Sequence, residues 1–171
     1  IIIAISGKSG CGNSTVSRVV AERLGLHVVN YTFHTIADEQ GISFDQLREM
    51  AETDPSWDRY LDKRQVEMAS KGNCVLGSRL AIWMMEDADL KIFLDASLEV
   101  RAKRIQQREG GDLETVREKT RERDQRDHDR YLKLYGIDNN RYREAADLVI
   151  DTEKNNIEQT AQIVIDAVRK L

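Results

Sequence analysis

Short apolar segments rich in Ile, Val and Leu alternate along the chain with segments whose apolar residues recur every three or four positions. Segments of the first kind predict buried strands at Ile1–Ser6, Leu26–Val29, Asn73–Gly77, Leu90–Asp95 and Asp147–Asp151. Segments of the second kind predict helices over Ser14–Leu24, over Ser97–Arg108 and along a last segment running from Ile157 to Val168. This alternation predicts an α/β fold, in which helices cover both faces of a parallel sheet.

Two polar, mostly helical stretches, 33–71 and 109–145, interrupt the alternation. Each comes after a strand in chain order, so we expect both to lie over the carboxyl edge of the sheet, where such sheets bind ligands. A length of 171 residues fits one domain. We therefore predict a single domain whose core is formed by 1–32, 72–108 and 146–171, with the two stretches as inserts.

The composition is that of a folded protein, with 40% hydrophobic residues, 33% charged residues and one Pro. A net charge of −4 argues against general binding to nucleic acid or to a membrane surface. No apolar run reaches the ~18 residues of a membrane span, and no signal-peptide pattern is visible. The two cysteines, Cys11 and Cys74, have neither metal-ligand nor disulfide spacing. These features predict a reduced, cytoplasmic protein.

The strongest local motif, GKSGCGNS, lies at Gly7–Ser14 between the first strand and the first helix. Its spacing is that of the phosphate-binding loop GxxxxGK[ST], in which glycines let backbone N–H groups turn inward at a helix N-terminus. Three correctly spaced glycines disfavour the alternative of a simple connecting turn. We predict an ATP site with Mg²⁺ on the Ser14 hydroxyl. The expected ATP-binding residues are Gly7, Lys8, Ser9, Gly10, Cys11, Gly12, Asn13, Ser14 and Thr15.

Asn13 occupies the position at which the phosphate-loop motif has Lys. A carboxamide cannot supply the cation that bridges the outer phosphates. Lys8 lies in the same loop, and it either reaches those phosphates or remains a solvated surface lysine; the sequence leaves both alternatives open. We treat Lys8 and Asn13 as candidate catalytic residues.

A second cluster lies in the 109–145 insert, where many Lys, Arg, Asp and Glu residues follow one another. One interpretation is a solvated helix with ion pairs along it. However, Arg123, Arg126, Asp127 and Arg130 fall at i, i+3, i+4 and i+7, on one helix face. Guanidinium groups suit forked binding of phosphate oxygens. A carboxylate among them is held ionised and accepts from a ribose hydroxyl or a base amine.

The third candidate is Arg79, which directly follows the third predicted strand. An arginine at the carboxyl edge of the sheet, next to a phosphate loop, faces the ligand-binding crevice. The alternative interpretation is an ordinary loop arginine.

Together these segments resemble cytidylate kinases, a branch of the nucleoside-monophosphate kinases among the P-loop proteins. Glu122–Arg130, which reads ERDQRDHDR, resembles the lid signature E-R-D-x-R-D-x-x-R of that family. Lys91–Ser97 is similar to a stretch of bacterial members, and Arg64-Gln65, Arg79-Leu80-Ala81 and Tyr131–Asp138 resemble archaeal-type members. The resemblance covers nearly the whole chain.

The resemblance implies a three-layer α/β/α P-loop fold with strand order 2-3-1-4-5. It also implies transfer of the γ-phosphoryl group of MgATP to CMP or dCMP. The 33–71 insert would bind the acceptor, 109–145 would form a lid, and Asp151–Asn155 would lie near the donor base. We expect a monomer whose partners are small molecules.

The resemblance also assigns roles to single residues. Arg126 would act at the transferring phosphoryl group, Arg79 would hold the acceptor phosphate, and Asp127 would contact the acceptor sugar or base. The expected acceptor-binding residues are Arg79, Arg123, Asp127, Arg130, Arg59 and His34.

Three positions depart from the family pattern: Asn13 replaces the loop lysine, His34 stands where an arginine is expected, and Gly77 replaces a strand-end acid. Two alternatives therefore stay open. One is a kinase for another nucleoside monophosphate or small molecule on the same fold. The other is a nucleotide-binding protein with little transfer activity.

Overall fold

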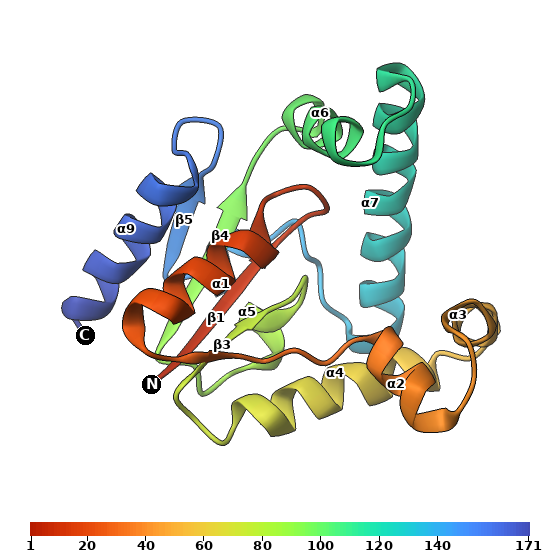
Figure 1. Cartoon of the computed structure of the whole chain (residues 1–171), viewed down its shortest axis with the longest axis horizontal. Helices are drawn as coiled ribbons and strands as arrows, with labels where there is room; N and C mark the ends of the chain where they lie inside the picture. The colour runs from red at the N-terminus through yellow and green to blue at the C-terminus, as the bar shows by residue number, and fades with distance from the viewer.

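A computed structural model describes all 171 residues and contains one parallel sheet (Figure 1). Its strands are β1 (Ile2–Gly7), β2 (His27–Val28), β3 (Cys74–Gly77), β4 (Leu90–Asp95) and β5 (Leu148–Asp151). The order is β2-β3-β1-β4-β5, and every neighbouring pair is parallel. The predicted α/β class and strand order are confirmed. The second strand is shorter than predicted, because only two exposed edge residues pair with β3.

The helices predicted from periodicity are present as α1 (Asn13–Leu24), α6 (Leu98–Glu109) and α9 (Ile157–Arg169). The first insert folds into α2 (Phe33–Gln40), α3 (Phe44–Thr53) and α4 (Ser56–Ala69). The second consists mainly of α7 (Leu113–Tyr135), followed by the short α8 (Tyr142–Ala145). One further short helix, α5 (Ala81–Met84), is visible only in the structure.

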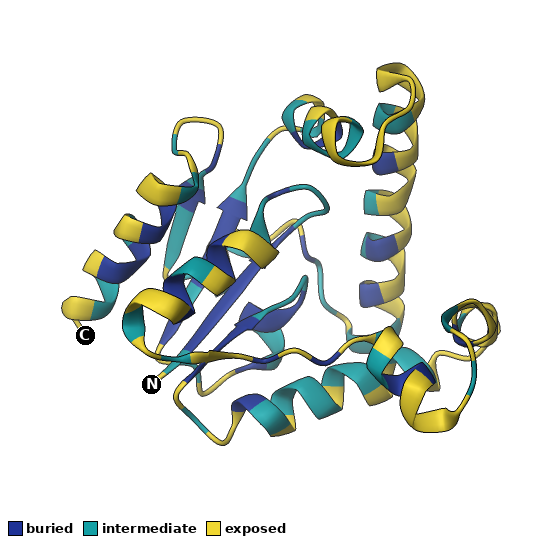
Figure 2. Ribbon diagram, viewed as in Figure 1, coloured by how far each residue is buried: buried dark blue, intermediate teal, exposed yellow.

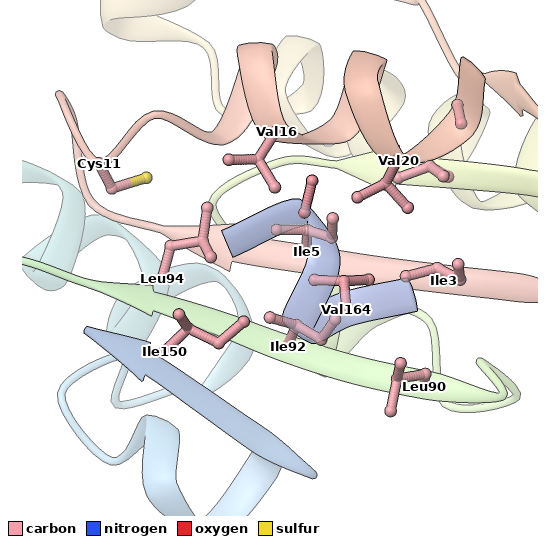
Figure 3. Packing of buried hydrophobic residues seen from close by; sticks show 13 residues of the cluster. Ile3, Ile5, Cys11, Val16, Val20, Leu90, Ile92, Leu94, Ile150 and Val164 are labelled. Carbon is pink, nitrogen blue, oxygen red and sulfur yellow. The ribbon is translucent and has the colours of Figure 1, made fainter. Parts of the chain in front are cut away.

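Helices α1 and α9 cover one face of the sheet (Figure 3). Ile5 and Ile92 from the strands meet Val16 of α1 and Val164 of α9, and none of these four side chains is exposed to solvent. Because the sheet is covered on both faces, its strands read as unbroken apolar runs and not as alternating ones.

The opposite face of the sheet packs against α5, α8 and the end of α4. Leu76 and Phe93 belong to this second cluster, together with Ile82 of α5. Tyr142 at the start of α8 stacks on Phe93 with ring centroids 3.9 Å apart. Helix α8 is thereby fixed to β4, the strand beside β1.

The first insert has a small apolar cluster of its own. Tyr31, Ile36, Ala37 and Leu47 are buried together between α2 and α3. The Gln65 side chain on α4 donates to the Tyr31 carbonyl at 2.8 Å, which joins this unit to α4.

Helix α7 stands beside the carboxyl ends of the strands and runs from α6 to the neighbourhood of α4 and α2 (Figure 1). Its buried residues are few and two are polar, namely Thr120 and Asp127, with Tyr131 as the third. Figure 2 shows the buried parts of α7 on the side that faces the rest of the molecule, while its outer side is exposed. No helix in the chain combines the length and the apolar character that a membrane crossing needs.

Candidate active site

The predicted phosphate loop connects β1 to α1 and packs closely on α6. Gly10 has φ +82°, and a Cβ atom there would lie 2.8 Å from the Arg101 carbonyl oxygen. Only glycine combines this left-handed conformation with such a close backbone approach. Gly12 also has positive φ and forms the N-cap of α1.

The N-terminus of α1 lacks the side-chain cap that α2, α3, α6, α7 and α9 have. Its first turn also contains no acidic residue, while Ser14 and Thr15 there are exposed. Backbone N–H groups in a first turn have no partner inside the helix, and the helix dipole is positive at this end. This end of α1 is therefore built to receive an anion.

Two arginines of α6, which sequence reasoning did not select, bind the carbonyl oxygens of the loop. Arg101 is 4% exposed, and its Nη1 donates to the Ser9 carbonyl at 3.2 Å. Nη1 of Arg104 donates to the Gly10 carbonyl at 3.2 Å, and its Nη2 donates to the Thr152 carbonyl at 2.7 Å. The carbonyl oxygens of the loop thus accept hydrogen bonds from α6. The i, i+3 spacing of the two arginines, which places them on one helix face, was the available sequence signal.

Arg101 also connects the loop to α7. Its Nη1 and Nη2 donate to the two carboxylate oxygens of Asp124 at 3.2 and 2.9 Å. Asp124 lies within the predicted lid signature, and in this structure its carboxylate binds protein. This forked pair fixes the first half of α7 against α6.

The Asn13 side chain turns back into the protein. Its Nδ2 donates to the Ile5 carbonyl at 2.9 Å, and its Oδ1 accepts from the buried Ser17 hydroxyl at 2.8 Å. A Cβ atom at Gly77 would lie 2.4 Å from Ser17 Oγ and 2.7 Å from Asn13 Oδ1. Two departures from the family pattern, Asn13 and Gly77, are therefore in contact and sterically dependent on each other.

Lys8 extends from the phosphate loop to the segment between α7 and α8. Its Nζ donates to Asn140 Oδ1 at 2.9 Å. The ammonium group thus has a specific partner within the chain, and that partner is uncharged.

At the end of β3, Arg79 faces α7. Its Nε lies 3.2 Å from Asp127 Oδ2, yet this buried nitrogen has no hydrogen bond of acceptable geometry. The other carboxylate oxygen of Asp127 accepts from Arg130 Nη2 at 3.1 Å. One buried carboxylate therefore lies between two guanidinium groups, one from the same helix and one from the segment after β3.

The remaining arginines on that face of α7 differ in their surroundings. Burial, and next the positive charge of Arg79, lower the pKa of Arg123, while the negative charge of Asp127 acts in the opposite direction. Arg126 is exposed and forms no ion pair within the chain. The predicted residues Arg79, Arg123, Asp127 and Arg130 thus lie around one region.

Two predicted acceptor contacts lie on the first insert. His34 is exposed on α2 and stacks on Phe44 with ring centroids 3.8 Å apart. Arg59 is exposed on α4, and its charge acts on Tyr135 of α7. Neither forms an ion pair or side-chain hydrogen bond with the cluster around Asp127, so their roles stay predictions.

Two carboxylates of α4, Asp58 and Asp62, were missed by sequence reasoning. Asp58 Oδ1 lies 3.7 Å from Arg130 Nη1, and Asp62 Oδ2 accepts from the Tyr135 hydroxyl at 2.6 Å. Burial raises the pKa of Asp62 to about 6, although the Tyr135 hydrogen bond acts in the opposite direction. Burial also raises the pKa of Asp58, against the attraction of Arg130. Their i, i+4 spacing on α4 was the available signal.

Comparison with known proteins is consistent with this geometry. The model of the cytidylate kinase-like family matches residues 2–154. The chain is 48% identical to cytidylate kinase 2 of Borreliella afzelii, covering 98% of this chain and 96% of that protein. It is 43% identical to the cytidylate kinase of Pyrococcus horikoshii, covering 100% of this chain and 90% of that protein. A solved shikimate kinase from Acinetobacter baumannii shares the fold, with a TM-score of 0.69, 22% identity and coverage of 99% and 93%.

We expect Gly77→Ala to lower the free energy of unfolding by about 1–3 kcal/mol, because the new methyl group enters the space of Ser17 Oγ and Asn13 Oδ1. Urea denaturation measures this change. The cost should be smaller when Ser17→Ala is also present, since the closest clashing atom is then absent. Equal costs in the two backgrounds would show that the contact is not the cause. Ser78→Ala, at the neighbouring position, is the control.

We expect Asp62→Asn to flatten the pH dependence of stability. In the folded protein the pKa of Asp62 is about 6, against 3.8 as the ordinary value, so the native state binds more protons than the unfolded state between these values. The stabilising contribution of Asp62 is present below about pH 4 and is lost as the pH rises through about 6. Urea denaturation across this range should show wild type losing stability relative to Asp62→Asn. Parallel curves would contradict the burial argument; Asp45→Asn, an exposed carboxylate on α3, is the control.

Proposed function

The chain belongs to the cytidylate kinase-like family and is therefore a nucleoside-monophosphate kinase, and we propose that it transfers the γ-phosphoryl group of MgATP to CMP and dCMP. The products are ADP and CDP or dCDP. The observation that carries this proposal is the cluster of Arg79, Asp127 and Arg130, where a buried guanidinium nitrogen without a hydrogen bond lies beside a carboxylate. Such a pairing suits a ligand that presents both phosphate oxygens and hydrogen-bond donors.

The uncapped start of α1 supports the donor assignment. Phosphate oxygens of ATP would accept from the backbone N–H groups of this turn and of the glycine loop. Asp151–Asn155, after β5, would lie near the donor base. Thr152 in this segment is already joined to the phosphate loop through Arg104.

A magnesium ion fits this donor site. Ser14 exposes a hydroxyl group at the start of α1, and no cluster of three His, Cys, Asp or Glu side chains forms an all-protein metal cage. Mg²⁺ in kinases is usually held by one or two protein oxygens, by water and by the phosphates of the substrate. When bound, it would neutralise charge on the β- and γ-phosphates.

On the acceptor side, Arg79, Arg123 and Arg130 would bind the phosphate of the monophosphate. Burial is the main cause that lowers the pKa of Arg123, and the charge of Arg79 is the next; binding of an anion would relieve this second effect, the mutual repulsion of Arg79 and Arg123. Asp127 would accept a hydrogen bond from the sugar or from the cytosine amino group. His34 and Arg59 would complete the acceptor insert, 33–71, from α2 and α4.

The transfer step requires in-line placement and positive charge at the moving phosphoryl group. Arg126 is free of ion pairs and lies on the same helix as Arg123 and Arg130. We assign it to the γ-phosphoryl group in a closed form, in which the lid, 109–145, lies over both nucleotides. Closure would also exclude water and so prevent hydrolysis of ATP.

We further propose that the protein acts as a monomer in the cytoplasm. All the residues assigned above belong to one chain. Both cysteines are buried free thiols, as in a reducing compartment.

A panel of acceptors tests the proposal. ADP formation from MgATP would be measured with CMP, dCMP, UMP, AMP, GMP, dTMP and no acceptor. Selective turnover with CMP and dCMP is the expected result. His34 supplies no guanidinium group where the family pattern has one. If turnover is fastest with another monophosphate, that compound and not CMP is the acceptor. ATP binding without turnover of any acceptor would contradict the proposal.

We expect Arg126→Ala to lower kcat about 10²-fold while the KM for CMP changes little, because the guanidinium is assigned to the transition state and not to acceptor binding. Steady-state kinetics measures both constants. The matched control is Arg121→Ala on the same helix, where the guanidinium pairs with Glu118 at the surface. An unchanged kcat, or a rise in KM alone, would remove Arg126 from the transfer step.

A further inference from the structure

The contact between Lys8 and Asn140 joins two parts of the site that are 132 positions apart in the chain. Asn140 lies in the segment 136–141, which connects the lid helix α7 to α8. This segment reaches the phosphate loop because Tyr142, at the start of α8, stacks on Phe93 of β4 and donates to the Asp95 carboxylate at 3.3 Å. β4 pairs with β1, the strand from which the phosphate loop begins.

The segment around Asn140 is itself held in place from α7. The backbone N–H of Asn140 donates to Asp138 Oδ1 at 3.0 Å. On the neighbouring residue, Oδ1 of the buried Asn139 lies 3.0 Å from Nδ1 of His128, a residue of the lid signature. A carboxamide oxygen only accepts, so Nδ1 of His128 donates to it. The same nitrogen therefore does not accept from Asn140 Nδ2, which lies 3.4 Å away. The position of Asn140 therefore depends on the lid helix.

The chemistry of this partner is informative. An ammonium group has three N–H donors, and the carboxamide of Asn140 occupies one of them. A carboxamide oxygen carries no net charge, so the full positive charge of Lys8 is retained and two donors stay available. A carboxylate in the same place would form an ion pair and cancel that charge.

The two arginines that contact the loop already bind other groups of the protein. Arg101 is paired with Asp124, and Arg104 donates to the carbonyls of Gly10 and Thr152. Position 13, where the motif has its lysine, is an asparagine bound to Ile5 and Ser17. Lys8 is thus the cation of the loop itself that lacks a carboxylate partner.

We propose that Asn140 is a positioning residue that holds Lys8 at the phosphate loop with its charge intact, and that His128 fixes the segment of Asn140 from the lid helix through Asn139. This inference rests on the proposed kinase function. Lys8 would then contact the outer phosphates of the donor in place of the absent loop lysine. Because Asn140 is anchored on α7, a change in the position of the lid would also change the position of that lysine.

The test is a double-mutant cycle between Lys8→Ala and Asn140→Ala, with kcat and the KM for ATP as readouts. We expect about 10²-fold lower kcat for Lys8→Ala, as for the loss of a charge at the phosphoryl group. Asn140→Ala should lower kcat about 3- to 10-fold, because Lys8 remains but is no longer oriented. In the Lys8→Ala background, Asn140→Ala should lower kcat no further.

Two further variants separate positioning from a structural role. Asn140→Asp should lower kcat more than Asn140→Ala, because a carboxylate neutralises Lys8, although it preserves an acceptor oxygen. His128→Ala should reproduce the effect of Asn140→Ala, while His27→Ala on the exposed edge strand is the control. Thermal unfolding of each variant identifies any loss of activity that results from a destabilised fold.

The outcomes distinguish this inference from the proposed function. Full activity of Lys8→Ala, or equal costs of Asn140→Ala in both Lys8 backgrounds, would overturn the inference while the kinase assignment stands. If wild type turns over no acceptor, the same cycle is measured by equilibrium binding of ATP. Non-additive losses of ATP affinity would then support the positioning of Lys8, and additive losses would overturn it.

Discussion

The buried guanidinium of Arg101 is the contact on which the arrangement of the site depends. It binds the Ser9 carbonyl of the phosphate loop and both oxygens of Asp124 on α7, while Nε donates to the Ala96 carbonyl at 3.0 Å. A buried charge is tolerated only when it is paired and its donors are satisfied, and here three separate elements supply the partners. Loop, sheet end and lid helix are therefore held in one geometry by one side chain.

The departures from the usual phosphate loop form a connected set and are not independent losses. Asn13 lacks the positive charge of the usual lysine, but its carboxamide links the Ile5 carbonyl to the Ser17 hydroxyl. That arrangement leaves no room for a side chain at position 77, so the strand-end acid is absent for a steric reason. A positive and a negative group are missing together, and the space behind the loop is neutral. Charge for phosphate binding must then come from the helix start, from arginines and from Lys8.

Local pattern was sufficient to predict the strands, the phosphate loop and the helix face that carries Arg123 and Asp127, since each depends on spacing within one element. Contacts between distant elements were not predictable in the same way. Lys8 and Asn140 meet only because α8 is fixed on β4, and Asp62 meets Tyr135 only because α7 crosses the end of α4. The strand order came from a family resemblance, because periodicity does not specify which strands are neighbours.

The placement of α7 explains how ligands can act on it. Its buried side is mostly polar, and it is held at its middle by the pair of Arg101 with Asp124 and at its C-terminal end by Tyr135 with Asp62. A helix without a continuous apolar stripe gains little from hydrophobic burial, so its position is set by these charges and hydrogen bonds. Between these two points, Asp127 forms ion pairs with Arg79 and Arg130. A phosphate bound as we propose would compete with Asp127 for these arginines, and so would change the energy of the helix that we propose closes over it.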